Sequence, residues 1–211
     1  MRIQGLDSLS EQDLDRLLRA IPFYKEIKQG DQLQLALLLQ NSRLIELEPG
    51  EIIVKRGDVG LWLYFVLKGA LAVYVNEPVG EPINQIISGE TFGDLAILEG
   101  GQRRATVAAA KSGRGATVLG LDFNAFGVLE DFSQIRLATK LQFYRLMVLG
   151  IRWKLEQKRL AQPNHPNAQR MLTCAMSVCE RDSLAELRAL HDQARSLADI
   201  LIDWNMETAL K

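Results

Sequence analysis

The spacing of hydrophobic positions changes twice along the chain and divides it into three parts. In residues 8–42 the hydrophobic side chains recur every three to four positions, which is the period of an α-helix. The recurring positions include Leu14, Leu17, Leu18 and Ile21. Ser10 followed by Asp13 resembles a capping box, and Asp31 can cap a second helix. We therefore expect N-terminal helices over residues 1–42.

From residue 43 the chain is made of short β-type runs separated by turns that contain glycine. The first run alternates apolar and polar positions over residues 44–48. The later runs are rich in β-branched and aromatic residues, and they cover residues 52–54, 61–67, 70–75, 83–87, 105–110 and 116–121. Short, evenly spaced strands are typical of a sandwich or jelly roll, since closing the sheets leaves no long exposed edge. The pattern predicts a mainly β domain, a sandwich or jelly roll, over residues 43–132.

The third part returns to the helical period, with a long helix over residues 133–162 and a helical extension over residues 163–211. One hydrophobic stripe of the long helix repeats at intervals of four and three, as the a and d positions of a coiled coil do. It consists of Leu137, Leu141, Tyr144, Val148, Ile151 and Leu155. A second stripe contains Leu146, Leu149 and Trp153. One stripe can pack on the barrel, and the other on a partner helix or on the C-terminal helices.

Charge and cysteine content limit which binding partners and which cellular compartment we expect for the protein. The formal net charge is −1, which gives no sign of a surface for nucleic acid or an anionic membrane. Cys174 and Cys179 fall in a stretch that we expect to be helical, where they would point to different faces and not bond. No apolar stretch has the length of a signal core or a membrane span. We expect a cytoplasmic protein.

One segment inside the predicted barrel, residues 89–107, does not have the pattern of a strand. Residues 94–98 have the length of one helical turn, which follows Gly93 and precedes a second glycine pair and two arginines. Backbone N–H groups at a helix start attract an anion, and glycine allows that anion to approach the backbone closely. An arginine adds fork-shaped hydrogen bonds to a phosphate, and a carboxylate can accept from a sugar hydroxyl. Together these groups can hold a ribose phosphate.

This segment resembles the phosphate-binding cassette of the cyclic-nucleotide-binding domain family, which includes regulatory subunits of cyclic-AMP-dependent protein kinase and bacterial catabolite activators. The matching motifs are Phe92-Gly93-Asp94-Leu95-Ala96 and Arg103-Arg104-Ala105-Thr106-Val107. The resemblance covers about residues 20–155, and it implies a mainly β jelly-roll barrel, a double-stranded β-helix, over residues 43–132. It implies cyclic AMP or cyclic GMP as ligand, no other cofactor, no metal, and a two-fold homodimer through the long helix. The implied ligand-binding residues are Gly93, Asp94, Leu95, Ala96, Arg103, Arg104, Ala105 and Thr106.

Two positions depart from the family pattern. The arginine that pairs with the cyclic phosphate falls on Arg103 when Thr106 sets the register, and on Arg104 in the longer bacterial register. Asp94 stands where the family has glutamate for the ribose 2′-hydroxyl, and aspartate is one methylene shorter. Asp94 can alternatively act as a helix N-cap. Arg104 replaces a small residue and can instead be a solvated surface charge.

Three functions fit these observations unequally. The leading hypothesis is a sensor in which nucleotide binding is coupled, through a hinge near residues 123–133, to the long helix and an unknown downstream protein. The second is a degenerate, ligand-free fold that serves as a dimerisation or protein-interaction module. A transcription factor fits poorly because residues 168–208 show no basic recognition helix, so DNA is not expected. We expect no enzyme, since His165 and His191 both lie outside the barrel.

Overall fold

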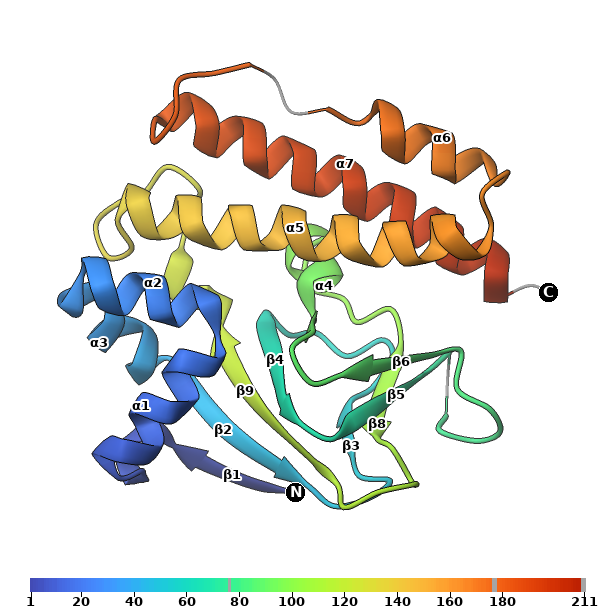
Figure 1. Ribbon diagram of the computed structural model, residues 1–211, viewed down its shortest axis with the longest axis horizontal. Helices are drawn as coiled ribbons and strands as arrows, with labels where there is room; N and C mark the ends of the chain where they lie inside the picture. The colour runs from blue at the N-terminus through green and yellow to red at the C-terminus, as the bar shows by residue number, and fades with distance from the viewer. Residues whose placement is uncertain (76, 176–177, 210–211) are drawn as a thin grey trace. The chain divides into compact units, whose positions relative to one another are not determined.

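The structure is a computed structural model that describes residues 1–75, 77–175 and 178–209. The chain forms two compact units, Met1–Ala125 and Phe126–Lys211. The first unit contains every strand together with the N-terminal helices, and the second contains the long helices (Figure 1). Each unit has its own packing.

The first unit is built on two antiparallel sheets. The larger sheet has the order β1 (Arg2–Gly5), β2 (Ser42–Leu47), β9 (Ala116–Asp122), β4 (Trp62–Lys68) and β7 (Thr91–Phe92). The smaller has the order β3 (Ile52–Val54), β8 (Thr106–Ala109), β5 (Ala70–Tyr74) and β6 (Asn84–Ile87). Alternating side chains from both sheets form one shared core, which includes Leu47, Val66, Leu71, Val107 and Val118. The predicted β fold flanked by helices is confirmed, as two facing sheets.

Two strands were not predicted. β1 pairs with β2 at the edge of the larger sheet, with Ile3 opposite Ile45. Ile3 is 54 % exposed, and a four-residue edge strand with little to bury gives almost no periodic signal. β7 is two residues long and pairs with β4, which is too short a run to recognise in a sequence.

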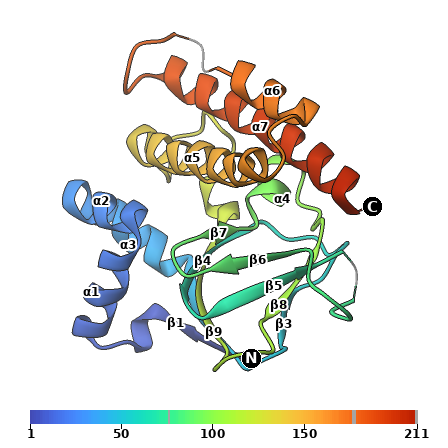
Figure 2. The ribbon, with the colours of Figure 1, turned by 45° about the vertical axis from the view of Figure 1, so that its right-hand side comes forward.

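The N-terminal helices are α1 (Glu11–Ala20), α2 (Pro22–Gly30) and α3 (Gln32–Gln40), preceded by the short 3-10 helix η1 (Leu6–Ser8). Both predicted caps are present, since Ser10 accepts from the backbone N–H of Asp13 and Asp31 accepts from two N–H groups of α3. Figure 2 shows these helices beside the larger sheet.

Aromatic side chains join these helices to the larger sheet. Phe23 and Tyr24 of α2 both contact Phe65 of β4, with ring centroids 6.5 and 5.8 Å away. The hydroxyl of Tyr24 also lies 2.6 Å from the hydroxyl of Ser42 at the start of β2. The helices are therefore packed on the sheet through α2.

The second unit consists of α5 (Leu137–Ala161), α6 (Pro166–Thr173) and α7 (Leu184–Ala209), and α7 runs along α5 (Figures 1 and 2). The 3-10 helix η2 (Phe123–Phe126) precedes them. α5 begins at Leu137, later than the predicted Ser133. The expectation that both cysteines lie in a helix is wrong, because α6 ends at Thr173 and Cys179 lies in the connection to α7. Both thiols are free.

The first hydrophobic stripe of α5 is largely buried in the described chain. Leu141, Tyr144, Val148, Ile151 and Leu155 are at most 6 % exposed, and Leu137 is partly buried. Tyr144 contacts His191 of α7, with ring centroids 5.6 Å apart.

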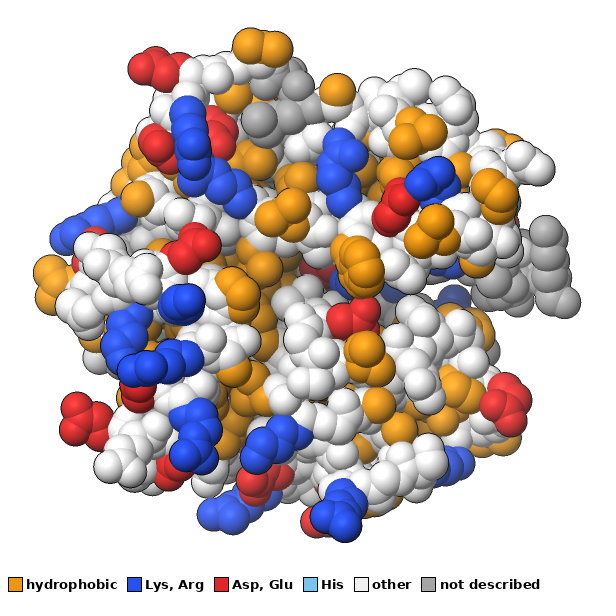
Figure 3. Space-filling view, viewed as in Figure 1, with side chains coloured by type: hydrophobic (Ala, Val, Ile, Leu, Met, Phe, Trp, Pro, Cys, Tyr) orange, Lys and Arg blue, Asp and Glu red, His pale blue; other side chains and the backbone are white. Residues whose placement is uncertain are grey.

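The exposed apolar side chains of α5 are Leu149, Trp153 and Leu160, at 68 %, 55 % and 64 %. Figure 3 shows hydrophobic side chains along the face of this helix that is turned to the viewer. Over the described ranges, no helix combines the length and the apolar character that a bilayer-spanning segment needs.

Candidate ligand site

The cassette segment leaves β7 through a glycine that no other residue can replace without strain. Gly93 has φ +93° and is the N-cap of α4 (Asp94–Leu98), the predicted single turn. A Cβ atom at this position would lie 2.3 Å from the carbonyl oxygen of Trp62 and 2.8 Å from Nη1 of Arg103. The glycine therefore brings the start of α4 against β4 and leaves room for the arginine.

The end of the cassette is bonded to the turn that precedes β4. The N–H of Gly57 donates to the carbonyl oxygen of Arg103, and the N–H of Arg103 donates to that of Asp58, both at 2.8 Å. The N–H of Gly60 donates to the carbonyl oxygen of Gly101 at 2.9 Å. Both ends of the segment are thus fixed to the sheets, and these backbone bonds set the directions of the two arginines.

Arg103 points into the first unit. Its side chain is 6 % exposed, and Nη1 donates to the carbonyl oxygen of Gly93 at 3.3 Å while Nη2 donates to that of Trp62 at 3.0 Å. The guanidinium carbon lies 5.6 Å from the centre of the Tyr64 ring. Burial lowers the pKa of Arg103, and the nearby Tyr64, Asp94 and Asp58 partly oppose this shift.

Arg104 points the other way. Its side chain is 46 % exposed and reaches Glu99, with Nη2 3.4 Å from a carboxylate oxygen. An exposed ion pair of this kind contributes little, at most about 1 kcal/mol. The structure therefore places one of the two candidate arginines inside the unit and the other on its surface.

Asp94 is 3 % exposed and is the first residue of α4 rather than its N-cap, which is Gly93. Its Oδ1 accepts from the backbone N–H of Leu95 at 3.1 Å. Arg103 donates to the carbonyl oxygen of Gly93, the residue before Asp94. The predicted carboxylate and the predicted arginine are thus both buried at the same end of α4.

The other predicted positions line the same segment. Ala96 is buried, and Leu95 and Ala105 are half-buried. Thr106 is 4 % exposed, and its hydroxyl oxygen accepts from the backbone N–H of Arg56 at 3.1 Å. Trp62 and Tyr64 were not predicted as neighbours of the cassette arginine. The strand period predicts which face of β4 they share, but not that this face meets Arg103.

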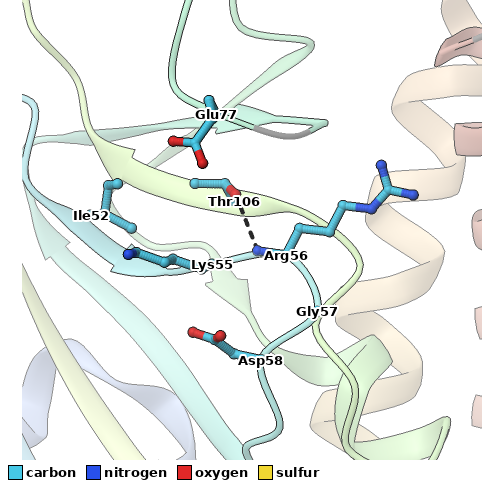
Figure 4. Close-up of a pocket in the computed structure, with 7 residues that line it drawn as sticks. All are labelled: Ile52, Lys55, Arg56, Gly57, Asp58, Glu77 and Thr106. Atoms are coloured by element: carbon cyan, nitrogen blue, oxygen red, sulfur yellow. Dashed lines mark hydrogen bonds between the residues drawn. The ribbon is translucent and has the colours of Figure 1, made fainter.

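A pocket of about 390 Å³ lies beside Thr106 (Figure 4). It is lined by Ile52, Lys55, Arg56, Gly57, Asp58, Glu77 and Thr106. The Arg56 side chain extends away from the other labelled groups in this view. The lining includes neither Asp94 nor Arg103, although Gly57 and Asp58 of the lining are hydrogen-bonded to the backbone of Arg103. Within the described ranges, no three His, Cys, Asp or Glu side chains gather as metal ligands would.

Comparison with known proteins gives a consistent result for the first unit. The family model described as "Cyclic nucleotide-binding domain" matches residues 44–126. The human potassium/sodium hyperpolarization-activated cyclic nucleotide-gated channel 3 is 30 % identical over 128 residues, which are 60 % of this chain and 16 % of the channel. The cAMP-dependent protein kinase regulatory subunit of Debaryomyces hansenii is 38 % identical over 81 residues, which are 38 % of this chain and 17 % of the subunit.

A solved structure shares the fold. It belongs to a candidate cyclic nucleotide-binding protein of Geobacter metallireducens, with a TM-score of 0.50 and 14 % identity, and the match covers 65 % of this chain and 93 % of that one. The chain spans less than a fifth of the length of the two curated relatives. With the two facing sheets, the glycine-capped turn and the inward arginine, these matches establish that residues 44–126 belong to the cyclic nucleotide-binding domain family.

Proposed function

We propose that this chain is a regulatory protein whose first unit binds cyclic AMP or cyclic GMP at the cassette. Arg103 pairs with the cyclic phosphate, and Asp94 accepts from the ribose 2′-hydroxyl. The observation that carries this proposal is the burial of Arg103 and Asp94 inside the matched domain, where Arg103 donates to the carbonyl oxygen of Gly93, the residue before Asp94. A buried guanidinium near neutral protein oxygens retains its charge, and that charge favours an anionic ligand.

The choice of Arg103 over Arg104 follows from the directions of the two side chains. Arg103 faces the interior beside Asp94, whereas Arg104 lies on the surface with Glu99. A hydrogen bond to a charged group contributes about 1.5–3 kcal/mol, and more where water is excluded. The phosphate contact is therefore assigned to Arg103.

Titration calorimetry with cyclic AMP and cyclic GMP tests this assignment. We expect micromolar binding by the unaltered chain, a loss of at least about tenfold in Arg103→Ala, and a change of less than about threefold in Arg104→Ala. The reverse order of the two variants would transfer the phosphate contact to Arg104. No heat with either nucleotide from a folded chain would reject the sensor function.

A second function, the ligand-free interaction module, has a specific observation in its favour. Arg103 is hydrogen-bonded to two backbone carbonyl oxygens, and it is not among the residues that line the pocket beside Thr106. A ligand that binds the folded state alone must raise its thermal stability. Identical melting temperatures with and without millimolar cyclic nucleotide would support the module.

The proposed output is a change in the segment that leads to α5. Within the second unit, Lys140 is 1 % exposed, and its Nζ donates to the carbonyl oxygens of Val128 and Leu129 at 2.5 and 3.2 Å. This lysine gives the hinge segment a defined arrangement that ligand binding can favour or disfavour. Such coupling requires different ligand affinities in the two arrangements, and hydrogen exchange of residues 126–136 with and without nucleotide measures it.

The proposed regulator is cytoplasmic and forms a homodimer. The first stripe of α5 is buried within the described chain, so the side chains available to a second copy are Leu149, Trp153 and Leu160. The proposed assembly therefore uses this exposed face of α5. Since the chain spans less than a fifth of the curated relatives, its downstream partner is not inferred from theirs.

A further inference from the structure

The pocket beside Thr106 lies on the face of the smaller sheet that is turned away from the shared core. Thr106 is opposite Tyr74 and Ile52 is opposite Ala108 in the strand register, and opposite residues share a face. Tyr74 and Ala108 belong to a separate cluster, against which Ile52 packs. Val107, the next residue of β8, belongs to the shared core. The pocket is therefore outside the space between the two sheets.

Charged side chains from one turn and one loop line this pocket. The N–H of Asp58 donates to the carbonyl oxygen of Lys55 at 3.2 Å, which closes the turn. Nη1 of Arg56 donates to the carbonyl oxygen of Val75 at 3.4 Å, and Figure 4 shows this side chain extending away from the other labelled groups. Arg56 therefore joins the turn to the chain just before Glu77. The charges left at the pocket are those of Lys55, Asp58 and Glu77.

The polar groups of the pocket lack partners in the described part of the chain. Lys55, Asp58 and Glu77 line the pocket without forming an ion pair to any described residue. Thr106 is 4 % exposed, and its hydroxyl oxygen accepts from the N–H of Arg56. The hydroxyl proton of Thr106 is donated to no described residue. Leaving a buried donor without an acceptor is unfavourable, so this proton calls for an acceptor from outside the chain.

These groups define the chemistry of a complementary ligand. A ligand carboxylate can accept from the Lys55 ammonium and the Thr106 hydroxyl in charge-assisted hydrogen bonds. Ligand ammonium groups can donate to Asp58 and Glu77, and a short methylene chain can lie on Ile52. A phosphate does not fit, because it would bring negative charge to two carboxylates. A metal ion does not fit either, since no three acidic, His or Cys side chains gather in the described ranges.

We propose that this pocket binds a small basic amino acid of about the size of free L-lysine. Such a molecule carries two ammonium groups and one carboxylate, which match the two carboxylates and one ammonium of the lining. The volume of about 390 Å³ is within the range of roughly 300–1,000 Å³ that small-molecule sites occupy. The site is additional to the proposed nucleotide site, because Arg103 does not line it.

Titration calorimetry with three related small molecules tests the match group by group. Cadaverine is L-lysine without its carboxylate, and 6-aminohexanoate is L-lysine without its α-ammonium. We expect L-lysine to bind the unaltered chain with a Kd of about 0.1–1 mM, and the other two to bind about tenfold more weakly. Equal affinities for L-lysine and cadaverine would overturn the carboxylate contact. No heat with L-lysine at about 10 mM, from a folded chain, would overturn the site as a whole.

Substitution of the exposed Glu77 tests one ammonium contact without removing a packed side chain. Glu77→Gln should raise the Kd for L-lysine about tenfold, because the ligand ammonium loses its charged acceptor. Glu81→Gln is the matched control, since Glu81 is an exposed glutamate of the same loop that does not line the pocket. It should change the Kd by less than about twofold. Equal Kd values for the two variants would overturn the assignment of Glu77.

Substitution of Lys55 tests the carboxylate contact with a change of preference. Lys55→Met should lose the preference for L-lysine over cadaverine, because it removes the cation that holds the carboxylate and leaves both acids in place. Lys68→Met, at an exposed lysine of β4 outside the pocket, should keep that preference. A preference of about tenfold that survives in Lys55→Met would overturn the proposed orientation of the ligand.

Discussion

At the scale of single residues, the site depends on one backbone position that only glycine fits. Gly93 has φ +93°, and a Cβ atom added at this position would lie 2.3 Å from the carbonyl oxygen of Trp62. The positive φ and the lack of space both disfavour a side chain, and the neighbour is backbone, which cannot move aside.

We therefore expect Gly93→Ala to destabilise the protein by about 3 kcal/mol in urea unfolding. Gly30→Ala is the control, because a Cβ there meets nothing within 4 Å and the residue ends α2. That variant should be neutral or about 0.5 kcal/mol more stable. Equal stability of the two variants would contradict the tight approach of Gly93 to β4.

A buried tyrosine gives the second unit a pH dependence. Burial raises the pKa of Tyr144 from 10.0 to about 12. The unfolded chain loses this proton near pH 10 while the folded chain keeps it, so the stabilisation is complete below pH 10 and is lost as the pH rises towards 12.

Between pH 9 and pH 11.5, the free energy of unfolding measured in urea should fall by about 2 kcal/mol less in Tyr144→Phe than in the unaltered chain. At pH 8 the two proteins should differ little, since the ring is kept. An equal alkaline loss in the variant would show that other groups cause it.

The sequence predicts the identity of the cassette residues better than their directions. Gly93, Asp94 and Arg103 were selected from the motif, and the structure bonds Arg103 to Gly93, the residue before Asp94. The register alone left Arg103 and Arg104 as rivals, because an extended segment alternates its side chains and one added loop residue exchanges inside and outside. The carbonyl oxygen of Trp62 carries no side-chain signal, so its bond to Arg103 could not be predicted.

At the scale of secondary structure, α7 is anchored to α5 by one arginine. Arg145 of α5 donates through Nε and Nη2 to Oε1 of Glu186, at 2.9 and 2.7 Å, and reaches Asp182 at 2.8 Å. Glu186 is 6 % exposed and also accepts from the backbone N–H of Asp182 at 2.6 Å. Ser183 accepts from the N–H of Glu186, so the same residues cap the start of α7.

Arg145→Met should therefore cost about 3 kcal/mol, because it leaves the buried carboxylate of Glu186 without its cation. The matched control is Arg188→Met on α7, whose exposed pair with Glu130 is worth at most about 1 kcal/mol. Urea unfolding followed by far-ultraviolet circular dichroism measures both. A smaller loss in Arg145→Met than in Arg188→Met would show that the anchor is not important.

Helix ends were predicted less well than helix faces. The caps at Ser10 and Asp31 were recognised because their side chains act on the nearest N–H groups. Pro22 is the first residue of α2, where the missing N–H costs nothing. α5 starts at Leu137, after the predicted residue, and Lys140 in its first turn binds carbonyl oxygens of the preceding loop, a contact between residues about twelve positions apart.

At the scale of the whole molecule, the arrangement of the second unit decides which surface another copy can use. α7 runs along α5, and the stripe that the heptad spacing selected is largely buried. The heptad spacing correctly identifies side chains of α5 that become buried. It does not show whether a helix of the same chain or a helix of a second chain covers them. Leu149, Trp153 and Leu160 remain exposed.

Three exposed side chains provide less apolar area than the roughly 1,000 Å² that a stable interface buries, so the association should be weak. Sedimentation velocity should therefore show self-association that increases with protein concentration. Trp153→Glu should shift the protein to monomer at every concentration tested. Leu172→Glu, on an equally exposed leucine of α6, should not. A monomer at all concentrations in the unaltered chain would reject the proposed dimer.

Glycines on both sides of α4 determine how the cassette can move. Gly93, Gly100 and Gly101 all have positive φ, while Ala96, Ile97 and Leu98 between them are at most 9 % exposed. The five-residue helix α4 is thus a rigid segment between flexible glycine positions. The chain before it is paired with β4, and the chain after it is bonded to the turn that precedes β4. A movement of the cassette would rotate α4 as one rigid body and increase the solvent exposure of Ile97 and Leu98. The amide protons of residues 94–99 would then exchange together rather than one after another.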